Sequence, residues 1–170
     1  KHFEVDAMTL NGKDEPITKS KRLNAVYLTL RDRAQDFKDA NGNVLIKKED
    51  WPQYKIHVTS ENNFPTAAGL ASSASGLACF TGCLATLFGF QERYPNELTN
   101  IARQGSGSAC RSLYGGWVKW EMGQKEDGSD SLAVQVADEH HWPEMRVLIL
   151  VAFGGQKEVP STGGMATTVQ

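Results

Sequence analysis

The sequence predicts a single α+β domain, and three patterns support this. Residues 20–37 carry the apolar stripe of an amphipathic helix, and residues 54–60 alternate as a half-buried strand does. Three strand-like segments, 117–122, 132–137 and 145–152, then follow one another. Consecutive strands after mixed elements favour α+β over a doubly wound α/β sheet, and a length of 170 residues suits one domain.

Composition excludes several classes of partner. The formal net charge is -2, with 18 Lys and Arg against 20 Asp and Glu, so no long-range field attracts nucleic acid or an anionic membrane. The longest apolar run, 147–152, suits a buried strand and is too short to span a bilayer. The cysteines, Cys79, Cys83 and Cys110, are odd in number, which indicates a reducing compartment, the cytoplasm by default.

The first third of the chain is predicted to begin with a hairpin. Residues 3–10 alternate as a strand, and the Asn-Gly pair within 11–14 is typical of a tight hairpin turn. The helix of 20–37 follows. Residues 39–50 are charged and rich in turn formers, so we expect an exposed loop before the strand of 54–60.

The middle of the chain is predicted to be helical. Residues 73–88 are apolar and small, typical of a helix buried on most sides. Residues 95–104 predict a short helix that stops at Gly105. A DGSD turn at 127–130 lies between the first two of the later strands.

Residues 62–75, NNFPTAAGLASSAS, contain little side-chain bulk at the entrance of a predicted helix. A helix begins with unpaired N–H groups and a positive dipole end, so Gly69 and the neighbouring alanines would let a phosphate approach closely, while Ser72 and Ser73 offer hydroxyls. The alternative is close helix packing with a serine cap. The spacing matches neither standard nucleotide-binding signature, and both readings stay open.

A second element rich in glycine and serine, GSGSACRSLYGG, spans residues 105–116. Ser106 and Ser108 lie two apart and Arg111 follows three later, so two hydroxyls and a guanidinium could converge on one carboxylate or phosphate. The alternative is a capped helix with Arg111 on the surface.

Two other clusters have simpler interpretations. Cys79 and Cys83 lie four apart on an apolar helix, but further zinc ligands are not evident, so we expect core thiols. Trp117 and Trp120 are three apart in a predicted strand, so they face opposite sides and do not form a stacking platform.

Two motifs resemble a known family. PTAAGLASSAS, residues 65–75, resembles the phosphate-binding motif of the GHMP kinase superfamily. GSGSACRSLYGGWVKWEMG, residues 105–123, resembles the mevalonate diphosphate decarboxylase family within it, whose kinases lack this block. The likeness extends over nearly all of the chain, from 10 to 165, and is weakest at 39–52.

The resemblance implies a fold and a domain assignment. The fold is the GHMP kinase N-terminal domain, a ribosomal-protein-like α+β sandwich with a left-handed crossover. Residues 1–170 would be one such domain, incomplete at both ends, with the C-terminal GHMP domain outside this chain. The family's first strand and its catalytic Asp are likewise expected outside it.

The resemblance also implies a reaction. ATP phosphorylates the 3-hydroxyl of mevalonate 5-diphosphate with Mg²⁺ assisting, the new phosphate leaves, carbon dioxide is lost, and isopentenyl diphosphate results. Arg111 orients the substrate carboxylate and, with Ser73, is assigned a catalytic role. Ser106 and Ser108 bind the substrate, and Arg22 and Ser161 match positions that line its diphosphate. The ATP loop comprises Pro65, Ala67, Ala68, Gly69, Leu70, Ala71, Ser72 and Ser73, and Ser73 is the candidate Mg²⁺ ligand.

Two alternatives differ from this function. One is another small-molecule kinase of the superfamily, which the 105–116 block argues against. The other is a non-catalytic fragment that binds nucleotide or diphosphate. For the full-length protein the resemblance implies a homodimer, with no nucleic-acid or membrane partner.

Overall fold

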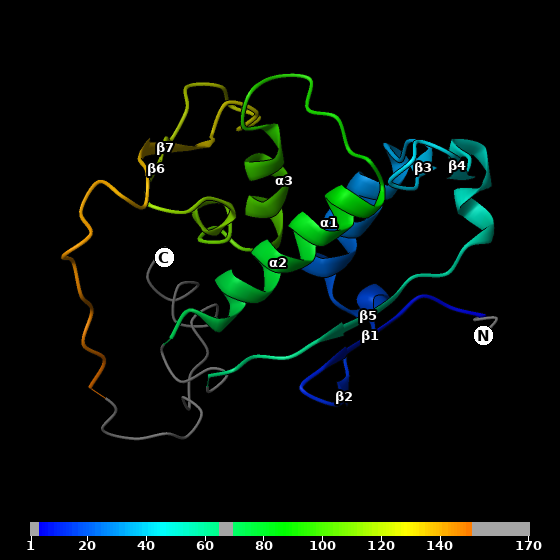
Figure 1. Ribbon diagram of the computed structural model, residues 1–170, viewed down its shortest axis with the longest axis horizontal. Helices are drawn as coiled ribbons and strands as arrows, with labels where there is room; N and C mark the ends of the chain where they lie inside the picture. Colours follow the sequence, from blue (N-terminus) through cyan, green and yellow to red (C-terminus); the bar gives the residue numbers. More distant parts are fainter. Residues whose placement is uncertain (1–3, 65–69, 151–170) are drawn as a thin grey trace.

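The computed structural model describes residues 4–64 and 70–150. Three helices lie at the centre, with the β3–β4 hairpin at one end and the β6–β7 hairpin at the other (Figure 1). The elements in order are β1 (Ala7–Leu10), β2 (Lys13–Asp14), the 3₁₀ turn η1 (Ile17–Lys19), α1 (Lys21–Asp32), β3 (Phe37–Lys38), β4 (Val44–Ile46), η2 (Lys48–Gln53), β5 (His57–Ser60), α2 (Ser72–Leu87), α3 (Glu97–Gly105), η3 (Arg111–Leu113), β6 (Trp117–Trp120) and β7 (Ala133–Ala137).

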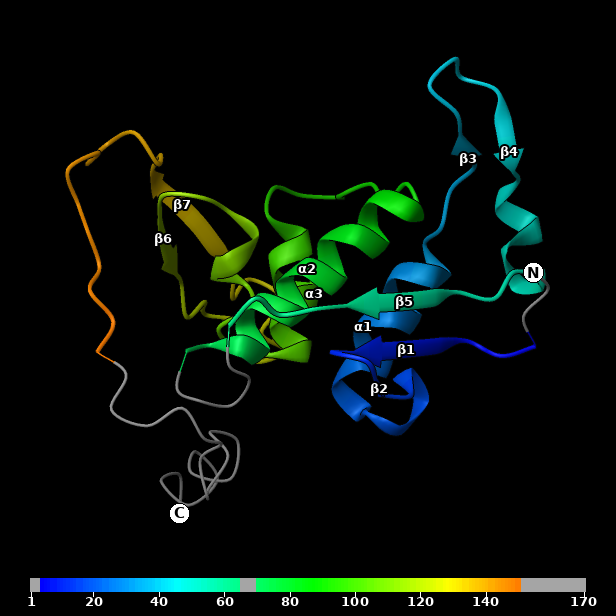
Figure 2. The same ribbon diagram turned by 60° about the horizontal axis from the view of Figure 1, so that its bottom comes forward.

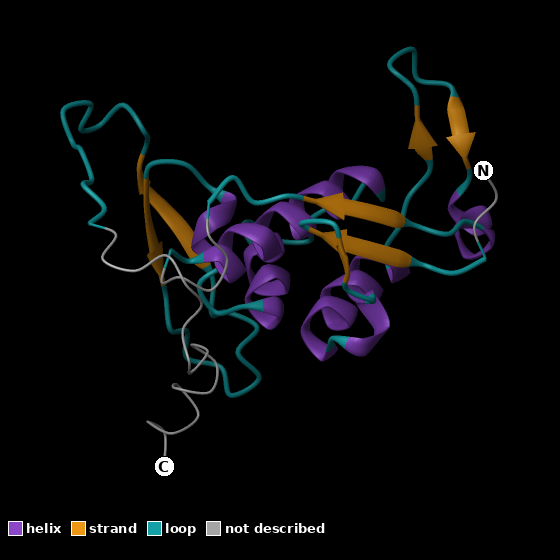
Figure 3. Cartoon of the chain, turned by 90° about the horizontal axis from the view of Figure 1, so that it is seen from below, coloured by secondary structure: helices purple, strands orange, loops and turns teal. Residues whose placement is uncertain are grey.

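A three-stranded sheet of order β2-β1-β5 covers one side of the helices (Figures 2 and 3). β1 and β2 form the predicted hairpin, with Asn11 and Gly12 both at positive φ, as a primed turn requires. β1 is parallel to β5 with Met8 opposite Val58, and parallel strands need a crossover, which here contains α1. The left-handed sense of this crossover remains a prediction.

The main core lies between this sheet and the helices. Met8 from the sheet and Val26, Tyr27, Leu30 and Phe80 from α1 and α2 are all buried in it. Ile56 and Val58 pack against the same cluster, so one face of the 54–60 segment is buried, as its alternating pattern predicted. The strand β5 begins only at His57. The α+β class predicted from the strand and helix patterns is thus confirmed, as helices packed with small separate sheets.

Two predicted boundaries near α1 are wrong. α1 ends at Asp32 rather than Phe37, because the next residues exchange helical hydrogen bonds for tertiary ones: Gln35 donates its N–H to Phe88 and accepts from the Trp51 indole. The expected loop of 39–50 contains most of a small hairpin, β3–β4, and the start of η2. Buried Trp51 anchors η2, which composition alone did not reveal.

Two further predictions differ from the structure. α2 is buried on one side only, where Leu77, Phe80 and Leu84 pack, while Cys79 and Cys83 are exposed rather than core thiols. Residues 145–150, predicted as a strand, form no strand in the described chain. Leu148 and Leu150 are 85% and 86% exposed, because no described strand pairs with this segment.

The β6–β7 hairpin confirms the first two of the three strands predicted after residue 116, and it attaches to α3. The turn between its strands binds α3 through Asn100 and Arg103, which both donate to the carbonyl of Gly128. Thr99 of α3 accepts from the backbone N–H of Ala133 in β7. These bonds fix the hairpin next to the end of α3, where the second glycine and serine loop begins.

A buried carboxylate holds the start of α3. Glu97 is 2% exposed and accepts from the guanidiniums of Arg33 and Arg93 at 2.7 and 2.6 Å. Burial alone would raise the pKa of Glu97, but the hydrogen bonds from Arg33 and Arg93 outweigh it and lower the pKa to about 2. The ionised form therefore joins α1 to the loop before α3.

We expect Glu97→Gln to lower the free energy of unfolding by about 3–5 kcal/mol at pH 7, because it leaves the partly buried guanidinium of Arg33 without its anion. Urea denaturation of the 170-residue protein measures this. Since the folded pKa lies below the unfolded value near 4.5, the difference between variant and parent is complete above pH 4.5 and shrinks as pH falls towards 2. A difference in the free energy of unfolding that does not change with pH would show that the ionised carboxylate of Glu97 is not the stabilising group. Glu121→Gln, at an exposed pair with Lys119, is the control and should change stability by under about 1 kcal/mol.

The end of α3 depends on close packing at Gly105. A Cβ at this position would lie 3.0 Å from Leu77 and 3.1 Å from Val26, and Val26 is fully buried and branched at its β-carbon. A larger residue would therefore require Leu77 and Val26 to shift where the three helices meet.

We expect Gly105→Ala to destabilise the protein by about 1–3 kcal/mol through overpacking. Gly76→Ala is the matched control, because a Cβ there meets nothing within 4 Å and alanine favours the interior of α2 by about 0.5–1 kcal/mol. Thermal unfolding should move in opposite directions for the two variants. An unchanged midpoint of thermal unfolding for Gly105→Ala would show that Leu77 and Val26 can shift to accommodate the methyl group, and it would contradict the overpacking.

Candidate functional site

A second, smaller core cluster brings the candidate segments together. It consists of Leu77 and Ala78 from α2, Ala102 from α3 and Ala109 from the loop after α3, with Leu23 of α1 and Leu113 of η3 packed against it. Small side chains allow these elements to approach closely. The first turn of α1, the first half of α2 and residues 105–113 thus meet around one cluster.

The start of α2 is the first candidate binding segment. Ala71, its N-cap residue, is in the left-handed region at φ 51 and ψ 32, and gives the helix no side-chain cap. A left-handed alanine costs roughly 1–2 kcal/mol, and such conformations concentrate at binding sites. Ser73 is exposed in the first turn, and Ser72 is half-buried beside it.

The loop of residues 105–111, here called the serine and arginine loop, is the second candidate binding segment. Ser106 follows the close contact at Gly105, and its Oγ lies 3.3 Å from Oγ of Ser108. Cys110 is fully buried and donates its thiol to the carbonyl of Gly107 at 3.1 Å, which closes the loop. The predicted pairing of the two hydroxyls is therefore present in the structure.

Arg111 is half-buried and lies over an aromatic ring. Its Cζ is 5.6 Å from the ring centroid of Trp120. Arg111 is therefore partly shielded from solvent on one side by the indole. Burial raises the pKa of the Cys110 thiol, against the opposing charges of Arg111 and Arg103, so two guanidiniums lie near this buried loop residue.

Positive charge here lacks carboxylate partners. Within residues 4–64 and 70–150, none of the ion pairs involves Arg22, Arg103 or Arg111. Arg103 binds the carbonyl of Gly128, but its buried Nε has no hydrogen-bond partner. Arg22 is exposed in the first turn of α1, next to Leu23 of the second cluster.

Sequence reasoning missed Arg103. Its position in the last turn of α3 is equally typical of a cation that stabilises a helix end. Only the tertiary contact with the β6–β7 turn shows that it lies near the loop.

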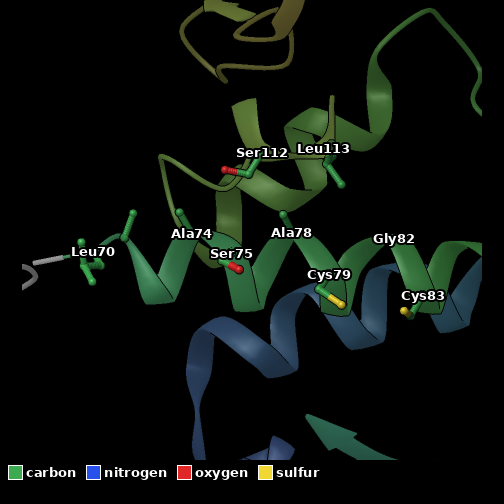
Figure 4. Close-up of a pocket in the computed structure, with 10 residues that line it drawn as sticks. Leu70, Ala74, Ser75, Ala78, Cys79, Gly82, Cys83, Ser112 and Leu113 are labelled. Carbon is green, nitrogen blue, oxygen red and sulfur yellow. The ribbon is translucent and has the colours of Figure 1, made fainter. Parts of the chain in front are cut away.

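A groove of about 570 Å³ runs along α2 beside both segments (Figure 4). Ala74 and Ala78 lie opposite Ser112 and Leu113, and the groove continues past Cys79 to Cys83. Leu70 and Ala71 line its other end, so it joins the start of α2 to the residues that follow Arg111. Ser73, Ser106, Ser108 and Arg111 do not line it, and we place the candidate site beside the groove rather than within it.

Some assigned residues cannot be placed. Pro65, Ala67, Ala68, Gly69 and Ser161 lie outside the described residues. The described ones fall into three groups around the second cluster: Leu70, Ala71, Ser72 and Ser73 at α2; Ser106, Ser108 and Arg111 after α3; and Arg22 on α1.

In chemical terms the arrangement suits an acidic ligand. It offers a helix start whose N-cap residue provides no side-chain cap, paired hydroxyls, and guanidiniums that form no ion pair with another described residue. Helix starts and arginine forks both favour phosphate and carboxylate groups. No helix within the described chain is long and apolar enough to cross a membrane.

Comparisons with known proteins agree with these motifs. Residues 1–133 match the model of the diphosphomevalonate decarboxylase-like N-terminal domain. The diphosphomevalonate decarboxylase of Eremothecium gossypii is 51% identical over 166 residues, which are 96% of this chain and 40% of that protein. The chain therefore spans about two fifths of the length of this relative.

Solved structures give the same result. The mevalonate diphosphate decarboxylase from Trypanosoma brucei superposes with a TM-score of 0.77 at 41% identity, over 98% of this chain and 40% of that one. The mevalonate diphosphate decarboxylase from Enterococcus faecalis, in a structure on its mevalonate diphosphate mediated ATP binding mechanism, superposes with a TM-score of 0.57 at 32% identity. The match covers 80% of this chain and 36% of that one. The fold is that of the GHMP kinases, and the chain belongs to the diphosphomevalonate decarboxylase-like N-terminal domain family.

Proposed function

We propose that this chain supplies the larger part of the N-terminal GHMP domain of an ATP-dependent decarboxylase that converts mevalonate 5-diphosphate to isopentenyl diphosphate. ATP would phosphorylate the 3-hydroxyl, and departure of that phosphate would accompany loss of carbon dioxide. The C-terminal GHMP domain would come from residues outside this chain. Below, the full-length protein means a chain of the relatives' length that contains these 170 residues.

The observation that carries the proposal is the loop of residues 105–111. It presents two adjacent hydroxyls and an arginine that forms no ion pair with any described residue, near Arg103, whose Nε is buried. A substrate with one carboxylate and one diphosphate has the complementary charge. In this assignment Arg111 orients the carboxylate, Ser106 and Ser108 bind the substrate, and Arg22 and Ser161 contact its diphosphate.

The start of α2 would hold ATP. The small side chains in the sequence of residues 65–71 would leave room for the triphosphate, and the first N–H groups of α2 and the hydroxyls of Ser72 and Ser73 would bind it. Phosphoryl transfer depends mainly on such positioning and charge neutralisation.

A magnesium ion at this site would have few protein ligands. The described residues contain no cluster of three or more His, Cys, Asp or Glu that could hold a metal ion. Mg²⁺ in nucleotide sites keeps several waters and binds substrate phosphates with one or two protein oxygens. The exposed hydroxyl of Ser73 can provide one such oxygen, and the ion would supply charge neutralisation on the phosphates.

Two assignments accompany this function. The exposed free thiols of Cys79 and Cys83 suit a reducing compartment, and we infer the cytoplasm. We infer a homodimer for the full-length protein from the family resemblance, with no nucleic-acid or membrane partner.

The first test is release of carbon dioxide from carboxyl-labelled mevalonate 5-diphosphate with ATP. We expect the full-length protein to release it. We expect the 170-residue chain to release none, because the family's catalytic Asp is assigned to a segment outside it. Calorimetric titration with a non-hydrolysable ATP analogue tests whether the chain alone binds nucleotide. A full-length protein without activity would favour the non-catalytic alternative, and activity with another small-molecule acceptor would favour the kinase alternative.

The second test concerns Arg111. We expect Arg111→Ala in the full-length protein to lower kcat/KM by roughly 30- to 4,000-fold, equivalent to about 2–5 kcal/mol for a charge-assisted contact. Arg146→Ala is the control, since Arg146 is exposed and, among the described residues, donates only to the carbonyls of 143 and 145. A near-normal rate for Arg111→Ala would refute its role.

A further inference from the structure

Trp120, the last residue of β6, contacts the loop of residues 105–111 in two places. Its ring lies beneath the guanidinium of Arg111, 5.6 Å from centroid to Cζ. Its far edge also lies against Gly107, where a Cβ would be 3.2 Å from Cη2 of the indole. A single side chain therefore packs on both the turn and the arginine of this loop.

The hairpin and α3 hold the indole in place. Its Nε1 donates to Oγ of Ser131 at 3.0 Å, and Ser131, only 5% exposed, donates to the carbonyl of Glu121 at 3.1 Å. Two residues later, Ala133 is bonded to Thr99 of α3. The ring is thus fixed relative to the helix from which the loop begins.

Core packing does not account for Trp120. It is 40% exposed and belongs to neither of the two buried clusters of the described residues. Trp117, on the same strand, differs: it stacks on Trp142 with centroids 5.8 Å apart. Trp120 is therefore the tryptophan of β6 that faces the candidate site.

We infer that Trp120, oriented by Ser131, is a positioning residue for Arg111 in the proposed decarboxylation, and this inference rests on the proposed function. The face of an indole attracts a guanidinium and limits its rotamers. Arg111 would then meet the substrate already oriented, and less side-chain entropy would be lost on binding. The inference concerns binding and orientation of the acidic substrate, and it leaves ATP binding unaffected.

The test uses steady-state kinetics of the full-length protein. We expect Trp120→Ala to raise KM for mevalonate 5-diphosphate about 3- to 30-fold, the range of a cation–π contact from exposed to desolvated settings. We expect KM for ATP to change less than about 2-fold. In an Arg111→Ala background, Trp120→Ala should add less than about 2-fold, because residues that act through one contact are not additive.

Two variants separate electrostatics from shape. Trp120→Phe keeps an aromatic face and should recover most of the parent KM, whereas Trp120→Leu keeps apolar volume beside Gly107 and should behave as Trp120→Ala does. If Trp120→Ala fails to fold, the substrate KM of Trp120→Phe is compared with that of Trp120→Leu, and a lower KM for the phenylalanine variant supports the inference. Trp117→Ala, with its separate stack, is the control and should leave KM for the substrate unchanged.

Several results would overturn the inference. A normal substrate KM in Trp120→Ala, equal recovery by Leu and Phe, or full additivity with Arg111→Ala would each show that Trp120 does not act through the guanidinium. In those cases the parent is active and the proposed function stands. An inactive parent would instead remove the proposed function and this inference with it.

Discussion

The close contact of three helices at Gly105 is the constraint on which the candidate site depends. A single methyl group there would press on Leu77 of α2 and Val26 of α1. The cluster of small side chains around it then continues to Ala109, inside the serine and arginine loop. Because the loop starts at this contact, its hydroxyls and guanidinium have fixed positions relative to the start of α2.

Charge near this contact is arranged differently from charge elsewhere in the described chain. Glu97, at the other end of α3, is buried with two arginines that neutralise it, and Arg31 pairs with Asp6 beside β1. These pairs support the fold. Arg103 and Arg111, by contrast, take part in none of the described ion pairs, and a backbone carbonyl or an aromatic ring holds each one. Guanidiniums placed in this way have no carboxylate partner among the described residues, as the proposed role in binding an acidic ligand requires.

Local patterns predicted local structure well. The Asn11–Gly12 turn, the stripe of α1 and the pairing of Ser106 with Ser108 followed from spacing and turn chemistry. Long-range contacts were not accessible in this way. The end of α1 is set by hydrogen bonds to Phe88 and Trp51, and the exposure of Cys79 and Cys83 depends on which side of α2 the other helices cover. Arg103 and Trp120 join the site through the hairpin of β6 and β7, whose position no periodicity encodes. The roles of the site residues remain predictions from the family resemblance.

The most direct measurement is a crystal structure of the full-length protein with mevalonate 5-diphosphate bound. We expect the substrate carboxylate to lie about 2.7–2.9 Å from the guanidinium of Arg111. Arg111 should still lie over the ring of Trp120, and the hydroxyls of Ser106 and Ser108 should point at the same ligand. A substrate bound elsewhere, or a carboxylate held by other residues while Arg111 faces solvent, would contradict this expectation.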